Sequence, residues 1–275
     1  MSKLSIAQHL LGFIAVLMSA YATADTSVLS SVADNTLIED VAGQGILNSD
    51  GQGTTFFAGT TQRAGLRRGL LRFNLTTIPS GAIVTSASLR LQLIRTRPES
   101  SPTVRIHRLT QSWDEGTSVS FGGIGSLATL GDATWLHRFC GAPNAADIVA
   151  GRPCGVATSQ FWTTAGGDFV AGASAVQSVV GLGPYSWSSA QLTADVQSWI
   201  NVPASNFGWV VVDEPSSSSK GYASRENVDP TIRPQLTITW SAPTISETNV
   251  PLPLWAAIAL GAGLLGIMRR RDKRV

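Results

Sequence analysis

The stretch Ala87-Ser88-Leu89-Arg90-Leu91-Gln92-Leu93 places an apolar residue at every second position. Because successive side chains of an extended chain point to opposite faces, the three leucines share one face, and Ser88, Arg90 and Gln92 share the other. Residues 71–75 and 235–240 alternate in the same way. The pattern predicts strands of a sheet that has one buried face.

Short segments of this kind recur along the chain, separated by Gly, Ser, Pro and Asn. They lie at 36–40, 54–59, 67–75, 83–96, 103–110, 133–139, 207–213, 221–226 and 235–240. Many short strands at such spacing favour an all-β fold, an antiparallel β-sandwich, over a parallel sheet covered by helices. One segment differs, because Leu192, Val196, Trp199 and Ile200 recur at helical spacing before Pro203. We expect a short helix there, at the edge of the sandwich.

The two ends of the chain differ from its middle. Residues 1–24 combine Lys3, an apolar run and small-x-small sites ending at Ala22 and Ala24, which is the pattern of a signal peptide. Residues 254–268 are apolar and precede a basic cluster, which predicts a single transmembrane helix with a cytoplasmic basic tail. We therefore expect a domain at 25–241, a linker at 242–249, and export across the inner membrane. The expected location is the cell surface or the extracellular space, with transient or permanent anchoring by the C-terminal helix.

The net charge of +2 arises at the ends of the chain. Lys3 contributes +1 and residues 250–275 contribute +4, so residues 25–249 carry −3. The basic isoelectric point is thus no argument for binding nucleic acid, and no such partner is expected. In the middle region 13 of the 14 basic residues are arginines, which suit two-point contacts with carboxylate or sulfate groups.

The two cysteines, Cys140 and Cys154, both follow the predicted signal peptide. In an oxidising compartment a disulfide between them is expected. By restricting the unfolded chain, it would stabilise the fold by about 3 kcal/mol. The alternative is a pair of unpaired thiols.

The sequence contains few candidate catalytic residues. After removal of the signal peptide only His107 and His137 remain, so a three-histidine metal site cannot form. There is no Gly-x-Ser-x-Gly elbow, phosphate-binding loop or His-Glu-x-x-His motif. Asp114-Glu115 follows Trp113 and is typical of a turn. We predict a protein without enzymatic activity, and a polysaccharide-degrading enzyme is the less favoured alternative.

Oxygen-bearing side chains gather between residues 34 and 50. Asp34, Glu39 and Asp50 are the candidate ligands of a structural Ca²⁺, with Asn35, Asp40 and Asn48 nearby. The alternative is a glycine-flanked turn at 48–51 that holds no metal. No other cofactor is expected.

Arginines on the polar face of the predicted strands suggest a binding surface. If Leu71 and Phe73 point inward, Arg68 and Arg72 point outward. Such a face could bind an acidic polysaccharide, through arginine contacts with carboxylates and aromatic contacts with sugar rings. The candidate carbohydrate-binding residues are Arg68, Arg72, Arg90, Arg105, His107, and, as exposed aromatic platforms, Trp162 and Trp187. The alternative is a solvated outer face whose charges prevent edge pairing.

Several blocks of the middle region resemble the DNRLRE-type domain, in order, over nearly all of residues 33–241. They are DNTLIE (34–39), FFAG (56–59), RRGLLRF (67–73), ATWLHRF (133–139), NFGW (206–209) and SREN (224–227). The resemblance implies a jelly-roll-like β-sandwich of secreted bacterial and archaeal proteins. It also implies a relation to a carbohydrate-binding module family associated with alginate.

The C-terminal segment is similar to PEP-CTERM sorting signals, in a VPLP variant. The residues that carry this similarity are Val250, Pro251, Leu252, Pro253, Arg269, Arg270 and Arg271. It implies an exosortase-type processing enzyme as a partner and an association with the biofilm matrix. Together these features favour an exported surface or matrix protein that binds acidic polysaccharide. The alternative is a structural or adhesive surface module that contacts proteins.

Overall fold

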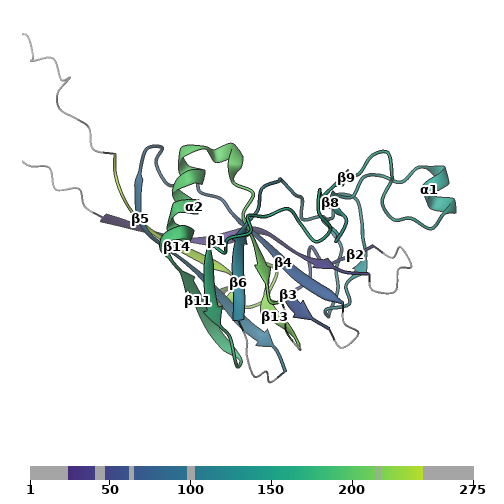
Figure 1. Cartoon of the computed structure of the whole chain (residues 1–275), viewed down its shortest axis with the longest axis horizontal. Helices are drawn as coiled ribbons and strands as arrows, with labels where there is room; N and C mark the ends of the chain where they lie inside the picture. The colour runs from purple at the N-terminus through teal and green to yellow at the C-terminus, as the bar shows by residue number, and fades with distance from the viewer. Residues whose placement is uncertain are drawn as a thin grey trace, which may run out of the picture. The chain divides into compact units, whose positions relative to one another are not determined.

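The computed structural model of the chain describes residues 24–40, 47–61, 65–97, 103–214, 216 and 218–243 (Figure 1). These residues form an all-β structure of antiparallel strands, as predicted. The strands are β1 (Ala24–Ile38), β2 (Asn48–Ser49), β3 (Thr55–Thr60), β4 (Leu66–Phe73), β5 (Ile83–Arg95), β6 (Thr103–Arg108), β7 (Ser126–Leu127), β8 (His137–Phe139), β9 (Gln160–Phe161), β10 (Ala175–Ser178), β11 (Gly183–Ser188), β12 (Trp209–Val212), β13 (Ser219–Ala223) and β14 (Gln235–Ser241). The helices are α1 (Ala145–Val149) and α2 (Ala190–Asn201), with short 3-10 turns η1 (Pro203–Ser205) and η2 (Pro230–Ile232).

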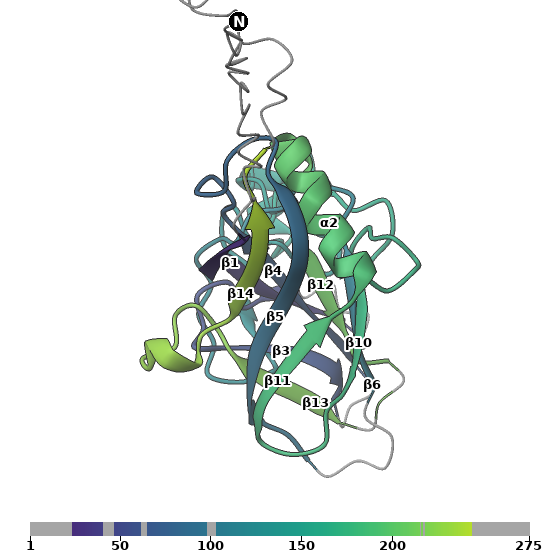
Figure 2. The same cartoon turned by 90° about the vertical axis from the view of Figure 1, so that its left-hand side faces the viewer.

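Within the described residues, ten strands form one continuous sheet in the order β1-β14-β5-β13-β3-β4-β12-β6-β10, with β11 paired to β5. The sheet folds back on itself because β1 pairs with β14 through its first half and with β4 through its second half. The pairing changes at an irregularity between Ser31 and Ala33, where a bulge bends the strand from one layer to the other. Figure 2 shows β14, β5 and β11 in front of β4, β12 and β6, as in a sandwich.

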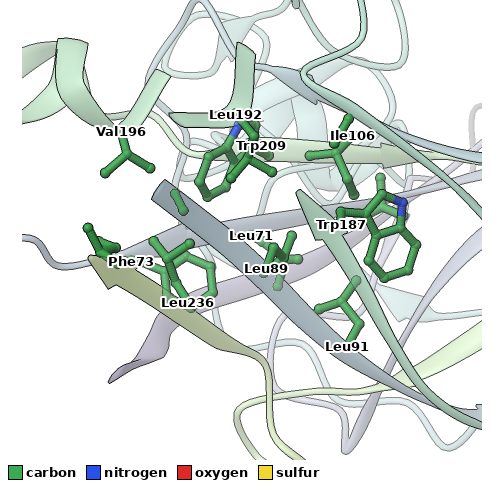
Figure 3. Packing of buried hydrophobic residues seen from close by; sticks show 14 of the residues in the cluster. Leu71, Phe73, Leu89, Leu91, Ile106, Trp187, Leu192, Val196, Trp209 and Leu236 are labelled. Carbon is green, nitrogen blue, oxygen red and sulfur yellow. The ribbon is translucent and has the colours of Figure 1, made fainter. Parts of the chain in front are cut away.

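The main core lies between these two layers. Leu71 of β4, Leu89 and Leu91 of β5, Trp187 of β11 and Trp209 of β12 are all buried in it (Figure 3). The alternation of residues 87–93 is confirmed, since the three leucines are buried and the polar residues between them are half-buried. Burial of each leucine stabilises the fold by roughly 1.5–3 kcal/mol.

Helix α2 closes one end of the main core. Leu192, Val196, Trp199 and Ile200 are its buried face, as the helical spacing predicted. Ser189 caps the helix by accepting a hydrogen bond from the Leu192 backbone N–H, and Pro203 follows its last turn. Asp195 fixes the helix to the sheet, because its carboxylate accepts a hydrogen bond of 3.0 Å from Trp209 Nε1.

A second layer covers the outer face of the sheet at β1, β4 and β12. It is formed by residues 109–174, between β6 and β10, which we call the inserted segment (Figure 1). Leu70 and Val210 on the sheet pack against Trp113 and Trp162 of the inserted segment in a second hydrophobic cluster. Both faces of β4 are therefore covered. The prediction that its outer face is open to solvent is wrong.

The predicted disulfide between Cys140 and Cys154 is confirmed. It lies within the inserted segment, with the two Cα atoms 5.0 Å apart, and both cysteines are buried beside Ala128 and Leu47. The bridge ties the base of the loop that carries α1, whose first turn is capped by Asn144.

The chain divides after Ala242 into two units, Met1–Ala242 and Pro243–Val275. The predicted signal peptide before Ala24, the linker beyond Pro243 and the whole sorting segment lie outside the described residues. In the part of the chain that is described, no helix has both the length and the apolar character needed to cross a membrane.

Candidate functional site

Strand β4 places two arginines beneath the inserted segment. Arg68 and Arg72 point away from the main core, as predicted, because they alternate with Leu71 and Phe73. The guanidinium of Arg68 lies over the ring of Trp135, 4.9 Å from its centroid, and that of Arg72 lies 5.2 Å from the ring centroid of Trp113. Cation–π contacts of this kind hold each arginine in one position.

A pocket of about 380 Å³ opens beside Arg72, and we call it the Arg72 pocket. It is lined by Arg72, Ser112, Trp113, Asp114, Arg138, Phe139 and Gln160. Nη1 of Arg72 donates to the Trp113 carbonyl oxygen at 3.1 Å, and Nη1 of Arg138 donates to Ser112 Oγ at 2.9 Å. A guanidinium has five N–H donors, so both arginines keep donors for a ligand.

The charges of the Arg72 pocket do not cancel. Arg72 and Arg138 face one carboxylate, Asp114, whose Oδ1 already accepts a hydrogen bond of 2.9 Å from the Glu115 backbone N–H. The lining thus carries a net charge of +1. It favours a ligand that is both polar and negatively charged.

A neighbouring pocket of about 460 Å³ contains Arg68, Thr110, Gln111, Thr163, Thr164, Ala165, Gly167, Asp168 and Phe169. Here the charges are already paired. Arg68 makes two hydrogen bonds to Glu214, at 2.9 and 3.0 Å, and the Asp168 carboxylate accepts from the backbone N–H groups of Thr163 and Thr164. This second pocket is polar but close to neutral.

The two pockets are neighbours on the same surface. Residues 112–114 line the Arg72 pocket, and the two residues before them line the neighbouring pocket. In the same way Gln160 lines the Arg72 pocket, and Thr163 and Thr164 line the neighbouring one. Arg68 and Arg72 are four positions apart on β4, which corresponds to about 13 Å along a strand. Gly166 lets the inserted segment approach this closely, since it has φ +86° and a Cβ there would lie 2.5 Å from Arg68 Nη1.

Arg105 and His107 also lie on the outer face, beyond Arg68. Nη1 of Arg105 donates to the Glu214 carbonyl oxygen at 3.3 Å. His107 is buried, with Nδ1 2.9 Å from the Val170 carbonyl oxygen and its ring against Phe169. Burial, followed by the charges of Arg105 and Arg68, lowers the pKa of His107 below its usual 6.5. His107 thus contacts the inserted segment through Val170 and Phe169. Neither His107 nor Arg105 lines the Arg72 pocket.

The prediction that Trp162 and Trp187 are exposed platforms is wrong. Trp187 is fully buried in the main core, because β11 pairs with β5 and sets it opposite Leu89. Trp162 is buried in the second cluster, and its Nε1 donates to the Thr134 carbonyl oxygen at 3.0 Å. The alternation around Trp187 is confined to Tyr185-Ser186-Trp187-Ser188, which is too short to have indicated burial.

Arg90 lies apart from the other candidate arginines. It projects from the outer face of β5, in register with Gln235 of β14, and donates to the Thr231 carbonyl oxygen at 3.3 Å. The predicted arginines thus lie in two separate places, with Arg90 on β5 and the others on β4 and β6. The sequence interpretation missed Arg138 and Gln160, because they join Arg72 only through the folding of the inserted segment over the sheet.

The residues predicted to bind calcium are also divided. Asp34 and Asp50 are buried, and each interacts electrostatically with Glu226. Glu39 lies at the far end of β1, where its Oε2 accepts from the Leu66 backbone N–H at 2.8 Å. Glu39 therefore does not join the other two. In the described ranges, no three His, Cys, Asp or Glu side chains already stand at the spacing of a metal site.

Burial affects the protonation of these acids. It raises the pKa of Asp34 well above its ordinary value and raises those of Asp50 and Glu226 to about 7. Nearby carboxylates act in the same direction. The sequence interpretation missed Glu226 as a member of this group.

Comparison of the chain with models of known protein families gave no match, and comparison with curated proteins gave none either.

Proposed function

We propose that the protein is an exported surface or matrix protein that binds acidic polysaccharide in the Arg72 pocket. The observation that carries this proposal is the pairing of Arg72 from the sheet with Arg138 from the inserted segment in one pocket of net positive charge. Two guanidinium groups can each make charge-assisted hydrogen bonds to a uronate carboxylate or a sulfate.

The remaining lining suits a sugar ring. Ser112 and Gln160 offer polar groups for hydroxyls, while Trp113 and Phe139 supply aromatic surface. The neutral pocket around Arg68 extends the surface, so that the next sugar units of a chain can lie along residues 110–114. The proposal is for binding without catalysis, because Asp114 is the single carboxylate of the Arg72 pocket and a glycosidase uses two.

The location and the finer fold belong to the same proposal. The predicted signal peptide and the VPLP-type tail support export and sorting by an exosortase-type enzyme, with the C-terminal helix as the membrane anchor. The resemblance to the DNRLRE-type domain supports a jelly-roll-like sandwich of the class found in extracellular proteins. A polysaccharide of the biofilm matrix is the ligand expected at that location.

Affinity electrophoresis tests the proposal. We expect the purified full-length protein to be retarded in gels that contain an acidic polysaccharide such as alginate. The variants Arg72→Ala and Arg138→Ala should each weaken binding about 10- to 150-fold, because a hydrogen bond to a charged group is worth about 1.5–3 kcal/mol. The matched control, Arg90→Ala, removes an arginine from the other layer and should bind as the wild type does.

Absence of retardation for the wild type, or equal retardation of all three variants, would refute binding at the Arg72 pocket. Because Arg138 is half-exposed and does not lie in either hydrophobic cluster, its variant separates loss of binding from loss of folding. Unfolding midpoints of all variants should be recorded beside the gels.

A structural or adhesive module is the second candidate, and one observation favours it. The inserted segment exposes large apolar side chains, among them Phe121, which is 87% exposed, and Ile124 and Leu130. Exposed apolar side chains are typical of surfaces that contact proteins. Adhesion of the purified protein to cell-surface protein, lost in Phe121→Ser and kept in Arg72→Ala, would support this candidate over polysaccharide binding.

A further inference from the structure

Four side chains from distant parts of the chain meet at one buried ion-pair centre. Arg225 is bound by both carboxylate oxygens of Glu115, at 2.6 and 2.5 Å, and its Nε lies 2.8 Å from Glu226 Oε1. The backbone N–H of Arg225 donates to Asp34 Oδ2 at 2.7 Å, and the backbone N–H of Asp34 donates to Glu115 Oε1. Two carboxylates thus share the Arg225 guanidinium, and the third accepts from the Arg225 backbone.

Asp50 adds a fourth carboxylate next to this centre. Its Oδ1 accepts a hydrogen bond of 2.8 Å from the Ser120 backbone N–H, and its charge interacts with that of Glu226. Glu226 interacts electrostatically with Asp34 as well, so it is coupled to both of the other acids. With every group ionised, the four carboxylates and Arg225 carry a net charge of −3 in a largely buried site.

Each of three acids turns one oxygen to a place where the protein supplies no hydrogen-bond partner. These oxygens are Asp34 Oδ1, Asp50 Oδ2 and Glu226 Oε2. Asp34 is 1% exposed and Asp50 is 2% exposed, so bulk water does not hydrate them. A buried carboxylate oxygen without a partner is strongly unfavourable, and the opposite oxygen of each of these acids is well bound.

We propose that Asp34, Asp50 and Glu226 bind a divalent cation, Ca²⁺, with their unpartnered oxygens. Hard cations bind carboxylate oxygens, and Ca²⁺ accepts six to eight oxygen ligands in flexible geometry, including backbone carbonyls and water. In the described ranges these side chains do not stand at metal-ligand spacing, so binding of the ion requires the three acids to move together. Glu226 takes the place that the sequence had suggested for Glu39.

The ion would join three segments of the fold. Asp34 lies on β1, Asp50 follows β2, and Glu226 follows β13. Glu115 of the inserted segment is held to the same centre through Arg225. Cation binding is therefore expected to fix the inserted segment on the sheet. The inference is independent of polysaccharide binding, because none of these residues lines the Arg72 pocket.

Thermal unfolding of the full-length protein, treated with EDTA and then supplied with CaCl₂, tests the proposal. A hundredfold excess of Ca²⁺ over the dissociation constant should raise Tm by roughly 5–10 °C. Asp34→Asn and Glu226→Gln should each abolish most of this rise. Glu39→Gln, which changes an acid outside the group, should keep it.

Isothermal titration of CaCl₂ into the same proteins supplies a second readout that does not depend on stability. We expect saturable binding with one ion per chain in the wild type and in Glu39→Gln, and at least a tenfold weaker binding in Glu226→Gln. If the wild type shows neither binding heat nor a rise in Tm, the carboxylates are neutralised by protons and the proposal is overturned. It is equally overturned if Asp34→Asn and Glu226→Gln respond as the wild type does.

Discussion

The ion pair between Lys220 and Asp213 provides a sharp test of how the sandwich is stabilised. Lys220 lies on β13 and Asp213 directly follows β12, with Nζ 2.7 Å from Oδ2. Both side chains are only 1% exposed. Two opposite charges at such depth are stable because each compensates the other, which a double-mutant cycle can measure.

The expected magnitude follows from burial. Lys220→Met leaves a buried carboxylate without its ammonium partner and should reduce the free energy of unfolding by about 3–5 kcal/mol. Asp213→Leu should cost a similar amount, because it removes the carboxylate that the buried Lys220 ammonium contacts at 2.7 Å. In the double variant both charges are gone, and the stability should lie within about 1–2 kcal/mol of the wild type or exceed it.

Urea denaturation of the four proteins, monitored by tryptophan fluorescence, measures each free energy by linear extrapolation. For a domain of this size the single variants should also lower Tm by roughly 6–20 °C. A loss below about 1 kcal/mol in Lys220→Met, or a double variant that loses the sum of the two single losses, would refute this explanation.

Three further predictions concern the core, the disulfide and pH. Replacing both Cys140 and Cys154 by serine should lower the free energy of unfolding by about 3 kcal/mol, because the bridge closes a loop with a sequence separation of 14. Urea denaturation of the wild type and the double variant without reductant checks this. An unchanged midpoint would contradict it. Trp187→Ala should cost about 3–5 kcal/mol as a core cavity, measured in the same way, whereas an exposed platform would cost almost nothing. Because the folded-state pKa of His107 is lowered, the stability that the neutral ring contributes is present above pH 6.5 and is lost as the pH falls through the folded-state pKa. The difference in unfolding free energy between wild type and His107→Gln should therefore shrink on acidification. A pH-independent difference would argue against a buried neutral ring.

Local patterns in the sequence were enough to predict the elements that pack with one face. The alternation at residues 87–93 and the helical spacing of Leu192, Val196, Trp199 and Ile200 both follow from burial of a single face, and the structure confirms both. The disulfide was predictable from the cysteine count and the predicted signal peptide, without any knowledge of geometry.

Elements that lack a periodic pattern could not be predicted in this way. Strands β10 and β11 were missed, because β10 has only four residues with its two apolar ones adjacent, and β11 opens with Gly-Pro and alternates only over its last four residues. The segment 133–139 was expected to be a strand, but only its last three residues pair, since Ala133 and Trp135 pack in the second hydrophobic cluster against the sheet instead. Strand β1 is much longer than the predicted segment 36–40, because its exposed first half pairs with β14.

The candidate sites depend on contacts between residues far apart in the sequence. Arg72 and Arg138 share a pocket only because the inserted segment folds over β4, and nothing near Arg138 in the sequence indicates this. Asp34 and Arg225 are 191 residues apart and still form a hydrogen bond. Residue type alone could suggest arginine and acidic sites, but chain topology decides which residues meet.

The most direct test of polysaccharide binding at the Arg72 pocket is an NMR titration that follows the indole N–H signals. Trp113 lines the pocket and donates from Nε1 to the Phe207 carbonyl oxygen, whereas Trp187 donates to the Val104 carbonyl oxygen inside the main core. Addition of an acidic oligosaccharide such as an oligo-alginate should shift the Trp113 signal in a saturable manner and leave the Trp187 signal unchanged. A saturable response that leaves Trp113 unaffected, or no response at all, would contradict the proposed function.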